Sequence, residues 1–236
     1  SGNVYVTGKK EYSDYGGISR IDMFLVKYDS SGTTQWTQQL EASVQDVANG
    51  NSAISAAGVA TDSSGNVYVT GYTKGGLDGN TNAGYEDNNS NAANANNDMF
   101  VVKYDSSGTK QWTQQLGMPG NDSGVGVATD SSGNVYVTGD TRYCISCDSI
   151  GLGGNIRLGL DDIFLVKYDS SGTMQWTKLF GTWTRDDVLA VTIDSSDNVY
   201  VTGATYGGMH GNFQSEGRCC PSDMFLVKYN SSGTLQ

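Results

Sequence analysis

The sequence has few prolines, few cations and no long apolar run. Prolines occur only at Pro119 and Pro221. The sequence contains 14 Lys and Arg residues against 25 Asp and Glu residues, which gives a net charge of −11. Contacts with nucleic-acid phosphates need clustered cations, so this balance argues against nucleic acid as a partner. A membrane-spanning helix needs about 18 apolar residues, and no run approaches that length, so no membrane span is expected.

Signs of nucleophilic catalysis are also scarce. The one histidine, His210, falls in an expected loop, and no serine lies in a G-x-S-x-G context. We therefore predict a non-enzymatic protein with no cofactor. One alternative stays open: a propeller enzyme that cleaves extracellular polysaccharide through paired loop carboxylates, because glycosidases need only two suitably placed acids.

What the sequence does contain is glycine and small polar residues. Glycine accounts for 32 residues, hydrophobic residues for 37% and charged residues for 17%. This composition favours many short strands joined by turns and disfavours long helices. It is also typical of an extracellular or cell-surface protein. There is no initiator Met and no signal peptide, so we expect a mature form or a segment of a longer protein.

Four near-identical blocks organise the chain. The motif NVYVTG begins at Asn3, Asn66, Asn134 and Asn198, at spacings of 63, 68 and 64 residues. A second block of the type DMFLVKYDSSGT follows each copy, and Q-W-T comes after three of them. A fourth block, such as GVATDSSG, precedes the later copies of NVYVTG. Internal repetition at this period indicates a repeat architecture.

Each unit is predicted to contain four short strands. A DSSG turn joins the first strand to the second and the third to the fourth, and a longer connection joins the second to the third. In such a turn the Asp side chain accepts backbone N–H bonds and the Gly takes the positive φ. Both faces of segments such as Phe24–Tyr28 are largely apolar, so the sheets should be covered on both sides. Radially stacked four-stranded blades satisfy this requirement.

The blocks VATDSSGNVYVTGYT and DMFVVKYDSSGTKQWTQQLG resemble the SBBP-type β-propeller repeat of secreted bacterial proteins. The resemblance implies an all-β propeller of four-stranded antiparallel blades in a surface or secreted setting. It brings no shared catalytic residues. We expect a single propeller domain over 1–236, with units at about 1–40, 41–116, 117–180 and 181–236.

The first unit lacks its first strand and the fourth lacks most of its last strand, so both outer blades are expected to be incomplete. Bare sheet edges invite pairing. Either more chain completes them in the native protein, or a neighbouring subunit supplies the strands and builds a head-to-tail filament. The leading functional hypothesis is a structural or interaction module whose partners are other copies of itself, other surface proteins or glycans.

The variable connections are expected on one face of the propeller, opposite the DSSG turns, and binding residues most often lie in such loops. Six loop aromatics are candidates for a protein or carbohydrate contact: Tyr12, Tyr15, Tyr85, Tyr143, Tyr206 and Phe213. Core or loop-packing roles fit the same residues equally well.

Four cysteines fall in two of these loops: Cys144, Cys147, Cys219 and Cys220. We expect disulfides that join the loops, although three pairings are possible and the sequence does not choose among them. A zinc site and a redox-active C-x-x-C are weaker alternatives, because adjacent cysteines suit tetrahedral geometry poorly and no helix is expected beside the motif.

A calcium site is a further hypothesis. Asp78, Asn80, Asn82 and Asp87 place oxygen donors at short intervals in one Asn-rich loop, as hard cations require. The glycine is displaced from the usual loop position and no bidentate Glu stands at its end, so a polar surface loop without calcium is the competing interpretation. A calcium-dependent ligand-binding domain is the functional alternative that this site would support.

Overall fold

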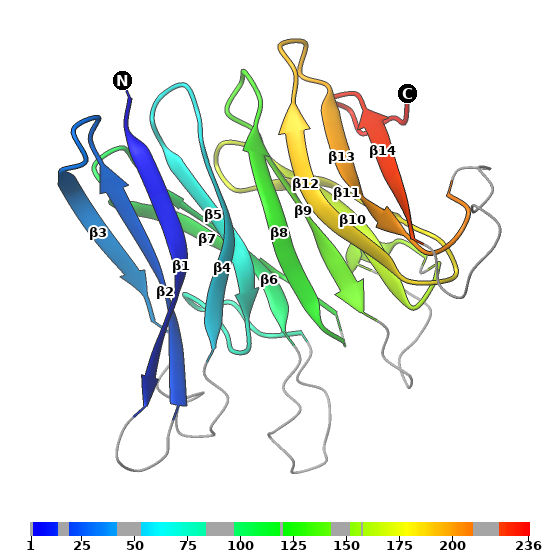
Figure 1. The fold of residues 1–236 in the computed structure, drawn as a ribbon, viewed down its shortest axis with the longest axis horizontal. Coiled ribbons are helices and arrows are strands. Elements are labelled where there is room, and N and C mark those ends of the chain that lie inside the picture. The colour runs from blue at the N-terminus through cyan, green and yellow to red at the C-terminus, as the bar shows by residue number, and fades with distance from the viewer. Residues whose placement is uncertain are drawn as a thin grey trace.

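The computed structural model describes residues 2–13, 19–41, 53–83, 97–118, 120–142, 152–156, 158–209 and 222–236. These residues form fourteen β-strands and one 3₁₀ turn, η2 (Leu152–Gly154). The strands make four separate antiparallel sheets of three or four strands, which we call blades 1 to 4 in chain order (Figure 1). The predicted all-β propeller-type architecture is confirmed.

Each blade is a meander in which consecutive strands pair. Blade 1 contains β1 (Val4–Ser13), β2 (Ser19–Tyr28) and β3 (Thr34–Leu40). Blade 2 contains β4 (Ile54–Thr61), β5 (Val67–Thr73), β6 (Asp98–Tyr104) and β7 (Lys110–Leu116). Blade 3 contains β8 (Asp122–Thr129), β9 (Val135–Arg142), β10 (Asp161–Tyr168) and β11 (Met174–Phe180). Blade 4 contains β12 (Asp186–Ile193), β13 (Val199–Thr205) and β14 (Asp223–Tyr229).

The DSSG segments form the hairpin turns, as predicted. In the β6–β7 turn, one carboxylate oxygen of Asp105 accepts the N–H groups of Ser107 and Thr109, at 2.9 and 3.0 Å. Gly108 takes the positive φ of 88° that follows a type I turn. The register shifts by one residue between Lys103 and Tyr104, so the turn is completed by a bulge.

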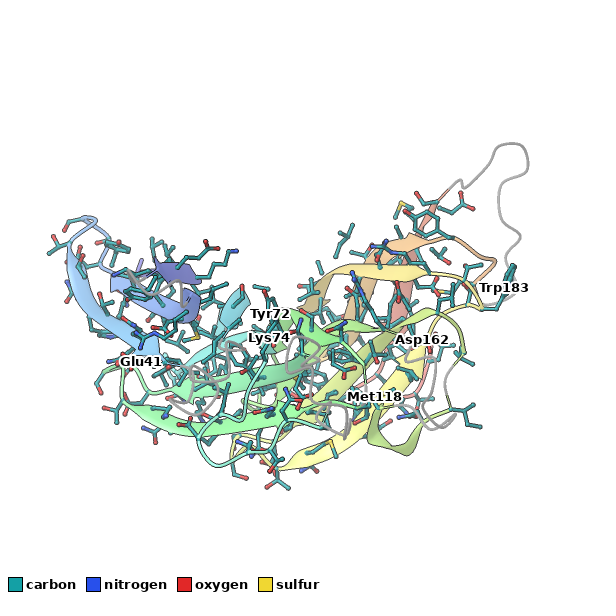
Figure 2. The ribbon with its side chains drawn as sticks, turned by 90° about the horizontal axis from the view of Figure 1, so that it is seen from below. Glu41, Tyr72, Lys74, Met118, Asp162 and Trp183 are labelled. Atoms are coloured by element: carbon teal, nitrogen blue, oxygen red, sulfur yellow. The ribbon has the colours of Figure 1, made fainter. Side chains whose placement is uncertain are left out.

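The apolar core lies between the blades. One cluster joins Met23 and Leu25 of blade 1 to Val67 and Phe100 of blade 2, and equivalent clusters join blade 2 to blade 3 and blade 3 to blade 4. The inner strand β8 lies against both β4 and β12. Seen from below, the four blades follow one another along an arc (Figure 2). Both faces of an inner blade are therefore buried, which explains the weak apolar alternation in the sequence.

A repeated hydrogen-bonded contact, the latch, fastens each blade to the next. Lys103 Nζ and Trp112 Nε1 of blade 2 both donate to the backbone carbonyl of Ser170, in the β10–β11 turn of blade 3, at 2.9 and 3.3 Å. The Trp112 ring also packs on Gly172, where an added Cβ would lie 2.9 Å from the ring. Lys27 and Trp36 of blade 1 make the same latch to Ser106 of blade 2. In blade 3 only Lys167 donates, to the carbonyl of Ser231 at 3.0 Å, and Trp176 Nε1 has no hydrogen-bond partner among the described residues.

The two outer faces expose positions that the inner blades bury. Met224 and Leu226 of blade 4 are 78% and 64% exposed, whereas their counterparts Ile163 and Leu165 in blade 3 are fully buried. The described residues contain no helix of the length and apolar character needed to cross a membrane.

Candidate functional site

The face opposite the hairpin turns, here called the loop face, carries the residues that differ between blades. Each NVYVTG motif ends on a glycine near this face while its strand continues beyond it, and the first and third positions after that glycine vary from blade to blade. We call these positions the rim. The rim consists of Lys9, Glu11, Tyr72, Lys74, Asp140, Arg142, Ala204 and Tyr206. A repeated scaffold thus presents a non-repeated set of side chains.

The rim carries both charges. Lys9 and Glu11 form an exposed ion pair at 2.8 Å, and this contact raises the pKa of Lys9 and lowers that of Glu11. The partly buried Tyr72 also acts electrostatically on Lys9, across the junction of blades 1 and 2. Tyr72 and Lys74 lie near the middle of the arc, whereas Trp183 lies at its far end (Figure 2). Such a mixed surface suits polar contacts with a protein or glycan more than binding of a strongly charged polymer.

Among the described residues, several charged side chains gather where blade 3 meets blade 4. Asp140 on β9 accepts the backbone N–H of Val188 on β12 at 2.9 Å. Arg185 Nε donates to Asp187 Oδ1 at 2.8 Å and lies 3.7 Å from Asp161 Oδ2. We call Asp140, Arg142, Asp161, Arg185 and Asp187 the junction cluster.

Within this cluster the carboxyl group of Asp140 is perturbed. Burial raises its pKa to about 6, and Asp187 and Asp161 push in the same direction. The Val188 N–H and Arg142 oppose the rise without cancelling it. Asp140 can therefore take up or release a proton near neutral pH. The hydrogen bond from Arg185 to Asp187 raises the pKa of Arg185.

A single tryptophan projects from the loop face beside this cluster. Trp183 is 79% exposed, although the neighbouring Thr182 is buried. The Thr182 N–H and hydroxyl both bond to Asp186 Oδ2, and Gly159 packs so closely on the Thr182 carbonyl that a Cβ would lie 2.0 Å from it. The backbone is thus held while the indole is free for contact, as in the aromatic anchors of protein interfaces.

Other acids near the loop face have structural roles. Asp122 accepts the N–H of Met118, and Asp98 accepts those of Ala83 and the Gln115 side chain. The contacts of Met118 and Ala83 each tie a connection to the strand that follows it, and the contact of Gln115 joins β7 to β6. Among the described residues, no three His, Cys, Asp or Glu side chains gather as a metal would require.

The structure places two of the six predicted aromatics. Tyr12 was expected in a loop but belongs to β1, because the ladder between β1 and β2 continues through the pair Tyr12 and Arg20. Its hydroxyl accepts the Gln39 amide at 3.1 Å, and the guanidinium of Arg20 lies 5.0 Å from the ring centre. Tyr206 is half-buried on the rim, and its N–H bonds to the Arg185 carbonyl. Tyr15, Tyr85, Tyr143 and Phe213 lie outside the described residues.

The predicted calcium ligands are only partly described. Asp78, with φ of 51°, uses one carboxylate oxygen for Lys110 and the other for Thr113, each at 2.5 Å. The Asn80 amide donates to the Leu77 carbonyl at 2.8 Å. These contacts fasten the turn to β7, which favours a structural role. Asn82 is buried near Thr73, and Asp87 lies outside the described residues, so calcium binding stays a prediction.

The four cysteines Cys144, Cys147, Cys219 and Cys220 also lie outside the described residues, so the disulfide prediction is not tested.

The repeats can be compared with known protein families. The family model described as the SBBP β-propeller repeat matches residues 35–78 and 111–142. At these residues the chain carries SBBP β-propeller repeats.

Two curated relatives are similar to parts of this chain. The "Regulatory protein FlaEY" of Caulobacter vibrioides is 27% identical over 180 residues, which are 75% of this chain and 18% of that protein. A WD repeat-containing protein of Acanthamoeba polyphaga mimivirus is 30% identical over an alignment of 154 positions that covers 58% of this chain and 11% of that protein. The chain therefore spans less than a fifth of the length of these relatives.

Among solved structures, a mutant of the Synechocystis apocarotenoid oxygenase is similar to this chain, and the alignment covers 100% of this chain and 65% of the oxygenase chain. The TM-score is 0.35 and the sequence identity is 7%. A similarity at this level carries no argument about the activity of the SBBP repeats.

Sequence reasoning missed the two features that stand out on the loop face. Asp140 directly follows the Gly of an NVYVTG copy, where the other blades have Lys9, Tyr72 and Ala204. Comparing the SBBP repeats position by position would have isolated it. Trp183 is the one tryptophan outside the Q-W-T blocks, and that irregularity was the available signal.

Proposed function

We propose that the chain is a non-enzymatic interaction module of a secreted or cell-surface protein, and that its loop face binds a protein partner. The observation that carries this proposal is Trp183, held by a fixed backbone and 79% exposed on the face where the blades differ. Exposed aromatics of this kind dominate the binding energy of many protein interfaces. The relatives named as a regulatory and a WD repeat-containing protein support the same class of function.

A site-specific crosslinking experiment tests this proposal. A photoreactive amino acid is placed at residue 183, with a matched probe at Ser195, which is exposed in the DSSD turn between β12 and β13 on the opposite face. Each protein is incubated with intact cells of the source organism. We expect one protein to be captured from position 183 and not from position 195.

The captured protein is then purified and its affinity measured. Trp183→Ala should weaken binding at least tenfold, since interface tryptophans contribute about 2 kcal/mol or more. Equal capture from both positions, or equal affinity of wild type and variant, would contradict binding through the loop face. Failure of an antibody against the chain to label intact cells would contradict the surface setting.

End-to-end assembly into a filament is a second candidate, and it rests on the latch. Lys228 of blade 4 is the counterpart of Lys103, and Ser30 of blade 1 is the counterpart of Ser170. Val4 and Val6 on the outer face of blade 1, and Met224 and Leu226 on that of blade 4, correspond to residues that inner blades bury against each other. A second copy placed head to tail would repeat the blade-to-blade contact.

Light scattering and electron microscopy at increasing protein concentration test the filament. Leu226→Arg should reduce association at least tenfold, because it places a charge in the repeated interface. Leu158→Arg, at an exposed leucine on the loop face, should associate like wild type. A wild-type chain that stays monomeric at every concentration would contradict the filament and leave the loop-face proposal untouched.

A further inference from the structure

At the first rim position, the junction of blades 3 and 4 has a carboxylate, whereas the other two junctions do not. The first rim position faces the next blade, and it is Lys9, Tyr72 and Asp140 in blades 1 to 3. Asp140 Oδ1 accepts the N–H of Val188 at 2.9 Å and so joins β9 directly to β12. Val188 stands beside the bulge in β12, where the ladder with β13 changes register.

Charged side chains from four segments surround Asp140. Arg142 lies on β9, Asp161 on β10, Arg185 in the connection after β11 and Asp187 on β12. Arg185 is bonded to Asp187 and lies near Asp161, so its charge is shared between these two acids. Ionised Asp140 therefore adds a third negative charge to a site where burial already disfavours ionisation.

We propose that the contact between blades 3 and 4 is a pH-sensitive joint, in which protonation of Asp140 tightens β12 against β9 and ionisation loosens it. The neutral carboxyl keeps its carbonyl oxygen for the Val188 N–H and removes the repulsion from Asp161 and Asp187. Trp183 comes three residues before β12, so the joint sets how firmly the exposed indole is held. This regulation rests on the proposed function, because Trp183 is the binding residue of the loop face.

The sign follows from the pKa of Asp140 in the closed and open joint. Burial raises that pKa from 3.8 to about 6 in the closed joint, and opening to water returns it to the ordinary value. The stabilisation is fully present below the ordinary pKa and is lost as the pH rises through 6. Between pH 5 and pH 7.5 the opening equilibrium of β12 should increase about tenfold, since each unit of pKa shift corresponds to a tenfold change.

Backbone amide exchange of the full chain tests the joint. Protection of peptides within 182–193 is measured at pH 5 and pH 7.5 and corrected for the intrinsic pH dependence of exchange. Peptides within 122–129 are the internal control, because β8 occupies the same position at the blade 2–3 junction, which has Tyr72 in place of Asp140. We expect β12 to be about tenfold better protected at pH 5 and β8 to be unchanged.

Two variants sharpen the test. Asp140→Asn keeps a carbonyl for the Val188 N–H and cannot ionise, so β12 should be equally protected at both pH values. Should this variant fail to fold, Asp187→Asn replaces it: loss of a neighbouring negative charge should move the midpoint of the β12 protection curve to lower pH. Equal protection of wild-type β12 at both pH values overturns the joint, as does a pH response that survives in Asp140→Asn or an unmoved midpoint in Asp187→Asn.

The two proposals fail separately. A flat exchange profile with intact crosslinking at position 183 overturns the joint alone. A normal pH response of β12 without any partner captured at position 183 overturns the loop-face function alone.

Discussion

At the scale of single residues, the glycines of the NVYVTG motif explain why the motif repeats. Gly71 of β5 lies opposite Ala56 of β4, next to the register shift between Ala56 and Gly58. A Cβ at position 71 would lie 1.9 Å from the backbone carbonyl oxygen of Ser55. The Gly is therefore required by the close approach of two strands.

This contact predicts a large cost for Gly71→Ala. The added methyl group meets backbone atoms that cannot move without displacing β4, so we expect the free energy of unfolding to fall by about 3 kcal/mol. Gly79→Ala is the matched control. Gly79 has φ of 87° with no atom near the position of a Cβ, so only backbone strain of about 1 kcal/mol is expected.

Urea denaturation of the two variants measures this difference. A Gly71→Ala protein as stable as Gly79→Ala would show that the strands do not approach as closely as described.

At the scale of secondary-structure elements, the latch makes the outer strand of each blade part of the contact with the next blade. In blades 1 and 2 the Lys on the third strand and the Trp on the fourth donate to one carbonyl of the following hairpin turn, and in blade 3 the Lys alone does so. The hairpin turn thus has two roles. It reverses the direction of the chain within its own blade, and its carbonyl group accepts hydrogen bonds from the preceding blade. The repeated Lys and Trp, which the sequence marks without explaining, are accounted for by this contact.

The latch predicts graded effects at Trp112. Trp112→Phe removes the hydrogen bond to Ser170 and should lower the free energy of unfolding by about 1 kcal/mol. Trp112→Ala also removes the packing on Gly172 and should lower it by about 3 kcal/mol. Trp183→Phe and Trp183→Ala, at an exposed position, should leave stability nearly unchanged.

Thermal unfolding monitored by near-ultraviolet circular dichroism distinguishes these cases. Similar losses at positions 112 and 183 would mean that Trp112 does not fasten the blades.

Most elements could be predicted because each strand recurs with its turn. The exception is β1, which runs through Tyr12 into a segment that we expected to be a loop. That segment has no counterpart in the other units and no apolar alternation, and its strand character comes from pairing with β2. Comparing the repeats marks Asp140 as an unusual residue at its position, but the sequence does not indicate its contact, because Asp140 meets β12 only once the blades are stacked.

At the scale of the whole molecule, carboxyl groups of two kinds set the response to acid. The turn carboxylates gain stability from ionisation: the Ser107 hydroxyl and the Thr109 N–H lower the pKa of Asp105, and contacts with Asn198 lower that of Asp194 to about 2. Their contribution is present above the ordinary pKa of 3.8 and is lost as the pH falls through the folded value. Asp140 acts in the opposite direction, because its pKa is raised.

The two trends predict a stability maximum at about pH 4 to 5. Below it the turn carboxylates become protonated, and above it Asp140 becomes ionised inside the blade 3–4 junction. The melting temperature measured from pH 2 to pH 8 should therefore rise and then fall. Asp140→Asn should remove most of the fall above pH 5 and leave the acid side unchanged, and a wild-type profile without a maximum would contradict this assignment.

The latch also allows one blade to take the place of another in the array. Each hairpin turn offers the same carbonyl acceptor and the same glycine to whichever blade precedes it, so one blade can follow another without a specially matched neighbour. Excising residues 117–180 would join Leu116 to Gly181, two positions that recur at the ends of their units, and bring Lys103 to Ser231. Gene duplication or loss of a single repeat could thus lengthen or shorten the array in one step, with the new junction already complementary.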